Sequence, residues 1–114
     1  MKAVNDELAE KIMGWKTWVA DGTREECWAT GDARRPTIRK SGWNPIEDIR
    51  DAWAVLEKLK GQSVVLNYGE DTQGWECSFI VGGKRFTSVR SEPTHAICYA
   101  ALYVVNEHWV ARVS

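Results

Sequence analysis

The sequence has almost no excess of charge of either sign. Fifteen lysines and arginines oppose sixteen aspartates and glutamates, for a net charge of −1. No global field therefore draws the chain to nucleic acid or to an acidic membrane, and any anion site must be local. No apolar run approaches membrane-spanning length, and residues 1–7 lack the apolar core of a signal peptide. We expect a cytoplasmic protein with no membrane contact.

Cysteines are few, and no metal-binding motif contains them. Cys27, Cys77 and Cys98 lie far apart and form no CxxC or Cys/His pattern with the spacing of metal ligands. The HExxH, P-loop and dinucleotide-binding patterns are also missing from the sequence. We interpret the cysteines as buried, reduced thiols, and we expect neither a metal nor a cofactor.

Groups suited to catalysis are scarce as well. No motif places a serine or cysteine nucleophile beside His95 or His108. Asp48 and Asp51 form an acidic pair with no sign of a burial-raised partner acid, so a hydrolase dyad has no support. We interpret His95 as a surface histidine, and we predict no catalytic residue and no enzyme.

Length and composition predict one folded domain. The 114 residues are 44% hydrophobic and 27% charged, which suits a chain that buries one core. We expect residues 1–114 to form a single domain, with its core in 44–105 and a loop-rich excursion over 16–43. Seven tryptophans are unusual in so short a chain. We interpret them as rings that fill a small core, with a ligand cage as the alternative.

The strongest helix signal follows Trp43. Asn44 can cap the first turn, Pro45 fits the first helical position, and Glu47 can close a capping box. The helix should run to about Lys60 and stop at Gly61. Apolar residues at helical spacing predict its core face: Ile46, Ile49, Trp53, Leu56 and Leu59.

Two further helices flank this one in the sequence. Residues 5–14 keep one apolar face, with Asn5 or Asp6 as the cap. Pro93 opens a last helix that reaches Val105, with small apolar residues that would let it pack flat on a sheet.

Between the second and last helices the sequence predicts three strands. They cover residues 63–68, 74–81 and 84–90, and Gly82-Gly83 marks a tight hairpin. Short strands are also expected at 25–30 and 37–39. The predicted fold class is α+β: an antiparallel three-stranded meander, or one of four or five strands with the additions, packed with helices in an α/β/α-type sandwich.

One local cluster of cations interrupts the balanced charge. Arg34, Arg35, Arg39 and Lys40 surround Pro36 in the long excursion. The third strand and its start add more cations, and an aromatic ring near them would allow stacking: Lys84, Arg85, Arg90, with Trp43 or Trp28. If loop and strand converge, these residues would form a pocket for a phosphate-bearing ligand. The alternative is a solvated basic loop.

Several segments together resemble the phage ABA sandwich family. They are residues 8–15, 43–45, 52–59 and 93–102, and the resemblance covers nearly the whole chain. It implies a layered α/β/α arrangement in a protein encoded by a phage or prophage. The family carries no assigned activity, so the resemblance implies no functional residue.

The order of elements over 44–105 also resembles that of a double-stranded RNA-binding domain. Such domains have a lysine cluster at the start of the last helix, where it contacts phosphates. This chain has Ser91 to His95 there, with an acid among them. We therefore do not expect double-stranded RNA as a partner.

These observations favour a protein that acts by binding. Our first hypothesis is a non-catalytic phage accessory protein that binds a host protein or a second copy of itself. The alternative is a binder of a small anionic ligand, a phosphate-bearing metabolite or signalling nucleotide, in a counter-defence role. A nucleic-acid binder is the third hypothesis, and balanced charge places it last.

Overall fold

The computed structural model describes residues 2–19, 25–59 and 63–113, with the backbone alone at residue 2 and from 107 to 113. These residues form three α-helices, a short 3-10 helix and two three-stranded antiparallel sheets. The predicted α+β class is confirmed. None of the helices in the described ranges has the length and apolar character needed to cross a membrane.

The larger sheet contains the three predicted strands. β4 (Ser63–Gly69), β5 (Gly74–Val81) and β6 (Lys84–Arg90) pair in the order β4-β5-β6, so the meander is confirmed. Gly82 and Gly83 take φ values of 60° and 79°, which suits the tight hairpin between β5 and β6. Phe79 pairs with Val64 on one side and Phe86 on the other, and this row faces the core.

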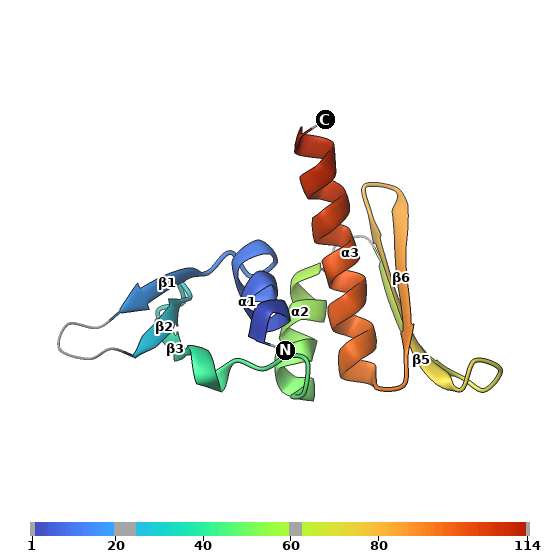
Figure 1. Ribbon diagram of the computed structural model, residues 1–114, viewed down its shortest axis with the longest axis horizontal. Helices are drawn as coiled ribbons and strands as arrows, with labels where there is room; N and C mark the ends of the chain where they lie inside the picture. The colour runs from blue at the N-terminus through green and yellow to red at the C-terminus, as the bar shows by residue number, and fades with distance from the viewer. Residues whose placement is uncertain (1, 20–24, 60–62, 114) are drawn as a thin grey trace.

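Helix α3 (Pro93–Val113) covers one face of this sheet (Figure 1). Ala96, Ala100 and Ala101 are fully buried, because small side chains let the helix lie close to β5 and β6. The helix continues past the predicted end at Val105, since no proline or glycine interrupts residues 106–113. The opposite face of the sheet carries no helix in the described residues.

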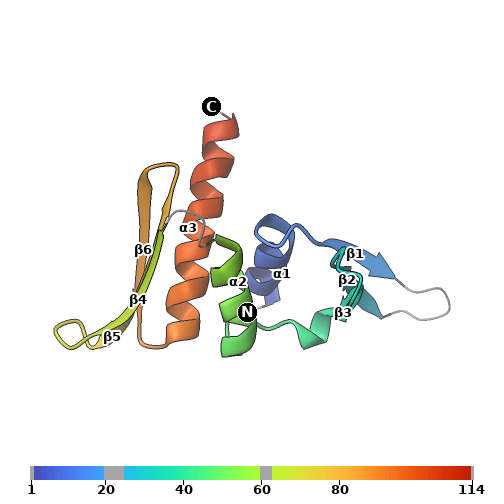
Figure 2. The same ribbon diagram turned by 180° about the vertical axis from the view of Figure 1, so that it is seen from behind.

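Helices form the middle of the molecule. α2 (Ile49–Leu59) and α1 (Lys2–Lys11) both pack on α3, on the side away from the larger sheet (Figures 1 and 2). The smaller sheet follows beyond α1 and α2. The layered sandwich therefore has its helices between two sheets, along a molecule that measures 53 × 33 × 24 Å.

Helix α2 begins four residues later than predicted. Residues 44–48 form a turn in which the amides of Glu47 and Asp48 donate to the Asn44 carbonyl. The Asn44 side chain bonds to Asn5 and Glu47 instead of to a first helical turn. Asp48 is the cap, because its Oδ1 accepts the Arg50 amide at 2.9 Å. The predicted stop at Gly61 lies outside the described residues.

Contrary to the prediction from the sequence, Asn5 does not cap a helix. It is a buried residue that links distant segments. Its Nδ2 donates to Asn44 Oδ1 at 2.9 Å, and its Oδ1 accepts the Ile46 amide at 3.2 Å. Its carbonyl oxygen accepts the Trp43 indole N–H at 2.9 Å. These bonds hold α1 against the turn before α2. The helix itself begins earlier than predicted, at Lys2, and ends at Lys11.

The excursion over 16–43 is more ordered than predicted. It contains β1 (Lys16–Val19), β2 (Glu26–Ala29), β3 (Thr37–Arg39) and the 3-10 helix η1 (Lys40–Gly42). The expected strands correspond to β2 and β3, and β1 was not predicted. The three form a sheet of their own in the order β1-β2-β3 and do not widen the meander. We call residues 16–19 and 25–42 the arm, because they project from the helices (Figure 2).

Aromatic and cysteine side chains divide between core and surface. Trp28 and Trp43 are buried, whereas Trp18 and Trp53 are 47% and 49% exposed. The interpretation of the tryptophans as core residues is therefore wrong for Trp18 and Trp53. Cys77 and Cys98 are free and buried, and burial raises the pKa of each thiol to about 12. Cys27 is also free, but it is half-buried.

Candidate functional site

The cations of the arm bond mostly within the arm. Arg39 Nε lies 3.4 Å from Glu25 Oε1, and Lys40 Nζ lies 3.2 Å from Glu26 Oε2. Lys40 Nζ also lies 4.2 Å from the centre of the Trp28 ring. The indole is fully buried beneath this ammonium group, so Trp28 cannot stack on a ligand as the sequence suggested.

Arg34 and Arg35 lie in the turn between β2 and β3. The Asp32 carboxylate accepts the Arg34 amide at 2.9 Å, and Thr30 Oγ1 donates to the Arg35 carbonyl at 2.6 Å. These bonds fix the backbone of the turn and leave both guanidinium groups exposed. Within the described residues, neither side chain has an acidic partner.

The strand cations belong to the other sheet. Arg90 lies with its guanidinium carbon 4.7 Å from the centre of the Tyr99 ring and donates to Tyr103 Oη at 3.1 Å. Lys84 Nζ is 5.9 Å from the centre of the Phe86 ring, and Arg85 is exposed. The helices separate β6 from the arm (Figures 1 and 2), so the structure does not bring the loop and strand cations together.

His95 lies in the first turn of α3, close to Arg90 in the sequence. Its Nε2 is 3.1 Å from Glu92 Oε2, and its ring meets the Tyr99 ring edge-on at 6.4 Å. The histidine is partly exposed, with 33% of its side chain accessible. Arg90, His95, Glu92 and the two tyrosines therefore form a small polar and aromatic cluster where β6 leads into α3.

Two of the predicted ligand residues line one pocket. Lys40 and Trp43 lie in a cavity of about 400 Å³ between η1, the 43–47 turn and α1, with Asn5, Asp6, Ser41, Asn44 and Glu47 as the other lining residues. The Trp43 ring is 96% buried and packs edge-on against Trp15, with ring centres 4.7 Å apart. It offers almost no face for stacking, so this expectation for Trp43 is wrong.

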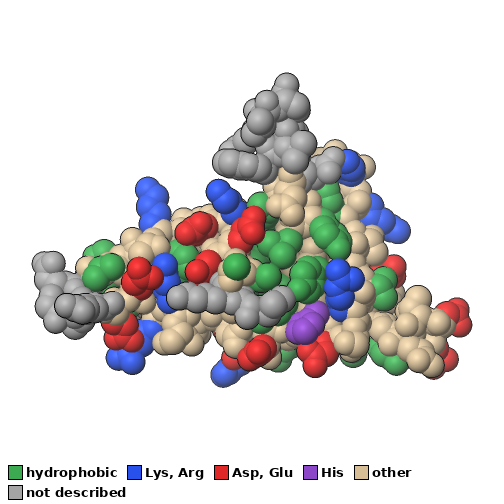
Figure 3. Space-filling view, viewed as in Figure 1, with side chains coloured by type: hydrophobic (Ala, Val, Ile, Leu, Met, Phe, Trp, Pro, Cys, Tyr) green, Lys and Arg blue, Asp and Glu red, His purple; other side chains and the backbone are tan. Residues whose placement is uncertain are grey.

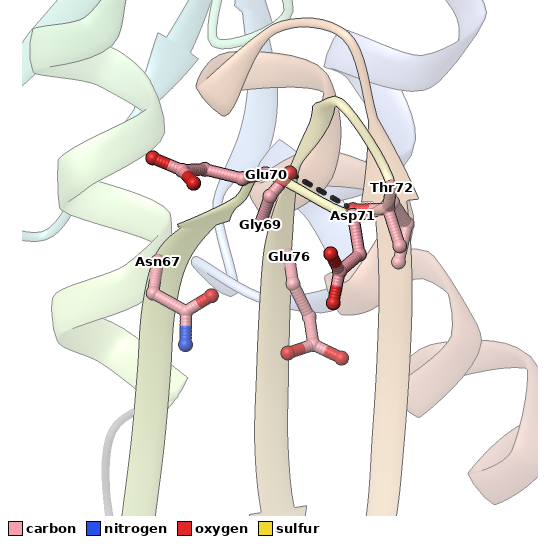
Figure 4. A pocket seen from close by; sticks show the side chains of 7 residues that line it. Asn67, Gly69, Glu70, Asp71, Thr72 and Glu76 are labelled. Carbon is pink, nitrogen blue, oxygen red and sulfur yellow. Dashed lines mark hydrogen bonds between the residues drawn. The ribbon is translucent and has the colours of Figure 1, made fainter.

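A second pocket lies at the β4–β5 hairpin. Its volume is about 320 Å³, and it is lined by Asn67, Gly69, Glu70, Asp71, Thr72, Glu76 and Val89. Figure 4 shows the Asp71 and Glu76 carboxylates on one side of the hairpin, with Glu70 pointing away from them. Among the described residues, no group of three or more histidines, cysteines or acids could hold a metal ion. These acids therefore lie at or near the turn of the hairpin and do not form a metal site.

Sequence reasoning missed the exposed apolar side chains. On β1 these are Trp18 and Val19, at 47% and 49% exposure, and on α2 they are Ile49 and Trp53, at 47% and 49%. The prediction that Ile49 and Trp53 lie on the core face is therefore wrong. Their i, i+4 spacing marks a flank of the helix beside the buried stripe of Ala52, Val55 and Leu56.

Charged side chains are mixed over the surface. Figure 3 shows lysines, arginines and acids interspersed, with apolar side chains gathered over the middle of this face. No broad surface of one sign is visible on this side. The exposed apolar side chains are therefore the more distinctive feature of the described surface.

Comparison with known proteins identifies a family. The model of the phage ABA sandwich domain matches residues 6–102. A 2.0 Å crystal structure of a phage protein from Bacillus cereus ATCC 14579 has a TM-score of 0.67 and 23% identity, covering 92% of this chain and 86% of that chain. That identity shows a shared fold alone. No curated protein matches the sequence. Since the family model spans most of the chain, the protein belongs to the phage ABA sandwich domain family.

Proposed function

We propose that this chain is a non-catalytic phage or prophage accessory protein that works by binding a protein of the bacterial host, in the host cytoplasm. The observation that carries the proposal is the half-exposure of two tryptophans, Trp18 on the arm and Trp53 on α2. Both stand beside another exposed apolar residue, Val19 and Ile49 respectively.

Exposed tryptophans of this kind are typical of binding surfaces. Tryptophan is among the residues most enriched at the energetic centres of protein interfaces, because its large ring buries much apolar area at low entropic cost. Trp18 and Val19 are adjacent on β1, and Ile49 and Trp53 are one helical turn apart. Ile49 and Trp53 therefore offer a compact apolar contact, whereas Trp18 and Val19 point to opposite faces of the arm and are exposed separately.

The test is capture of a partner by the purified protein and loss of that partner on truncation of the rings. We expect wild type to enrich a host protein from lysate at micromolar concentration. Trp18→Ala and Trp53→Ala, singly or together, should weaken direct binding of that purified protein at least about tenfold. Tyr103→Ala, at an exposed residue on α3, is the matched control.

Absence of any enriched host protein would refute the proposal. So would a partner that binds wild type and the double variant equally, because neither ring would then contact it. Circular dichroism of each variant separates loss of binding from loss of fold.

A second candidate function is the binding of a phosphate-bearing small ligand, and the cluster of Arg90, His95, Tyr99 and Tyr103 favours it. A guanidinium group on an aromatic face, beside a histidine in the first turn of a helix, suits an anionic group with an attached ring. Tight binding to the native state must raise the melting temperature by mass action. Melting with a panel of nucleotides tests this, and a flat response to all of them excludes it.

A further inference from the structure

The arm presents one face to solvent. The register places Trp18, Cys27 and Arg39 in one row across β1, β2 and β3, and Lys16, Ala29 and Thr37 in the next row of the same face. The opposite face carries the buried Trp28 and the half-buried Ile38 at its centre, with exposed Thr17, Val19 and Glu26 around them. We call the six residues of the solvent-facing rows the arm face.

Of the two edge strands of the arm, β1 and β3, β1 carries the exposed Lys16 and Trp18. It pairs with β2 on one side, and no described residue pairs with its other side. In an antiparallel edge strand, every second residue points its N–H and C=O away from the neighbouring strand. All four residues of β1 are exposed, and the strand contains no proline or bulge that would block pairing. β1 can therefore accept another extended segment.

Charge distinguishes the two ends of the arm. At the end near Val19, Arg39 and Lys40 are neutralised by Glu25 and Glu26. At the other end, Lys16 pairs in register with Ala29, which leads directly into the turn that carries Arg34 and Arg35.

At the Lys16 end three cations face one carboxylate, that of Asp32 in the same turn. No described acid lies within ion-pair distance of the Lys16, Arg34 or Arg35 side chain. Strands lie about 4.8 Å apart, so the turn is about 10 Å from β1, close to one Debye length at physiological salt. An acidic segment on β1 would contact Lys16 and be attracted by both arginines.

Resting on the proposed function, we infer that β1 binds an acidic, extended segment of the partner protein by strand addition. The main chain of the segment bonds to the outer edge of β1, Trp18 covers its apolar side chains, and Lys16 pairs with a carboxylate. Nucleic acid fits less well, because Arg39 and Lys40 at the other end of the arm already pair with Glu25 and Glu26 and do not continue a track of cations for a run of phosphates.

The probe is a fluorescein-labelled octapeptide of alternating valine and glutamate, measured by fluorescence anisotropy with the full-length protein. We expect saturable binding, and little binding of a valine–lysine octapeptide of the same length. N-methylation of alternate amides in the bound register should abolish binding, because it removes the main-chain donors. Amide hydrogen exchange at residues 16–19 should slow when the peptide binds.

Substitutions on β1 test whether the peptide binds there. Lys16→Glu and Trp18→Ala should each weaken peptide binding about tenfold or more. Lys58→Glu makes the same charge change on exposed α2, and Tyr68→Ala removes an exposed ring from β4, so both are matched controls that should bind as wild type.

Several results would overturn the inference: no peptide binding up to millimolar concentration, binding that Lys16→Glu and Trp18→Ala leave unchanged, or displacement of the peptide by an eight-residue oligothymidylate. Capture of a host partner decides the proposed function separately. A partner that Lys16→Glu still captures, together with a failed peptide assay, would leave protein binding in place and refute strand addition.

Discussion

The two sheets share strand number and antiparallel order but differ in what supports them. Strands β4, β5 and β6 have seven, eight and seven residues, and α3 buries Cys77, Phe79 and Phe86 against them. The arm strands have four, four and three residues, and Trp28 is their one fully buried large side chain among the described residues. Both sheets end in edge strands, but the larger sheet holds the core, whereas the arm exposes a tryptophan on an edge strand of four residues.

This difference separates the source of stability from the surface that we propose binds a partner. The helix-covered face of the larger sheet gains its free energy from buried apolar area, whereas the opposite face of that sheet exposes Val65 and Val89. The arm has little core of its own, but it presents Trp18, Lys16 and a free edge. Substitutions in the larger sheet should therefore change the free energy of unfolding, and substitutions in the arm should change the proposed binding of a partner.

The largest expected effect is on the core of the larger sheet. Phe79→Ala should lower the free energy of unfolding by about 3–5 kcal/mol, because the fully buried ring leaves a cavity between β5 and α3. Urea denaturation measures the change. Val65→Ala, on the open face of the same sheet, is the control and should cost less than about 0.5 kcal/mol. Equal losses would mean that the open face is also covered.

The second-largest effect is expected on replacing a buried tryptophan of the body, and the same replacement in the arm is the comparison. Trp43→Phe leaves the Asn5 carbonyl without its donor and should cost about 1–3 kcal/mol in the free energy of unfolding. Trp28→Phe should cost less, because Trp28 Nε1 has no hydrogen-bond partner in the described structure. Both changes remove the same atoms, so the difference reports the hydrogen bond. The reverse order in urea denaturation would contradict this comparison.

The buried cysteines of β5 and α3 make stability depend on pH, whereas Cys27 of the arm is not expected to. Burial raises the pKa of Cys77 and Cys98 from 9.0 to about 12, so the folded state holds these protons more tightly than the unfolded state. Their contribution to stability is complete below pH 9 and is lost as pH rises toward 12. The Tm should fall over this range, and less so in a Cys77→Ala, Cys98→Ala variant. A Cys27→Ala variant should follow wild type, and a larger change there would contradict the assignment.

The smallest effect concerns Asp48, which belongs to neither sheet. Hydrogen bonds from the Arg50 amide and then the Arg50 side chain lower the pKa of Asp48 from 3.8. Its contribution is present above pH 3.8 and is lost as pH falls through the lower folded pKa. Asp48→Asn should therefore reduce the Tm slightly at pH 7 and converge with wild type at strongly acidic pH. A difference that persists in acid would show that charge is not the cause.

Local signals were sufficient for the larger sheet and the helices around it. Alternating apolar residues in β5 and the Gly82-Gly83 pair predicted strands and turn, since both depend on near neighbours. The predicted start of α2 is too early because an asparagine side chain can either cap a helix or bond to a distant residue. The side chain of Asn44 bonds to Asn5, 39 positions away, and no local pattern encodes that bond.

The arm was predicted only in part for a related reason. β1 has four residues, too few for an alternating pattern to distinguish a strand from a loop, and its pairing with β2 defines it. The sequence shows where the cations lie along the chain, but the distance between them in space depends on which sheet contains each one. The exposure of Trp18 and Trp53 was missed because a tryptophan gives the same signal in a core and on a surface.

Trp15 and Trp43 touch each other with ring centres 4.7 Å apart, and they stand immediately before and after the arm. The chain thus leaves the body and returns to it at one closed junction, fastened further by the Trp43 bond to Asn5. A segment whose two ends meet in this way can change at its exposed positions with little effect on the packing of the helices. Under the proposed function, relatives with different partners are expected to differ in the arm before they differ in the helices.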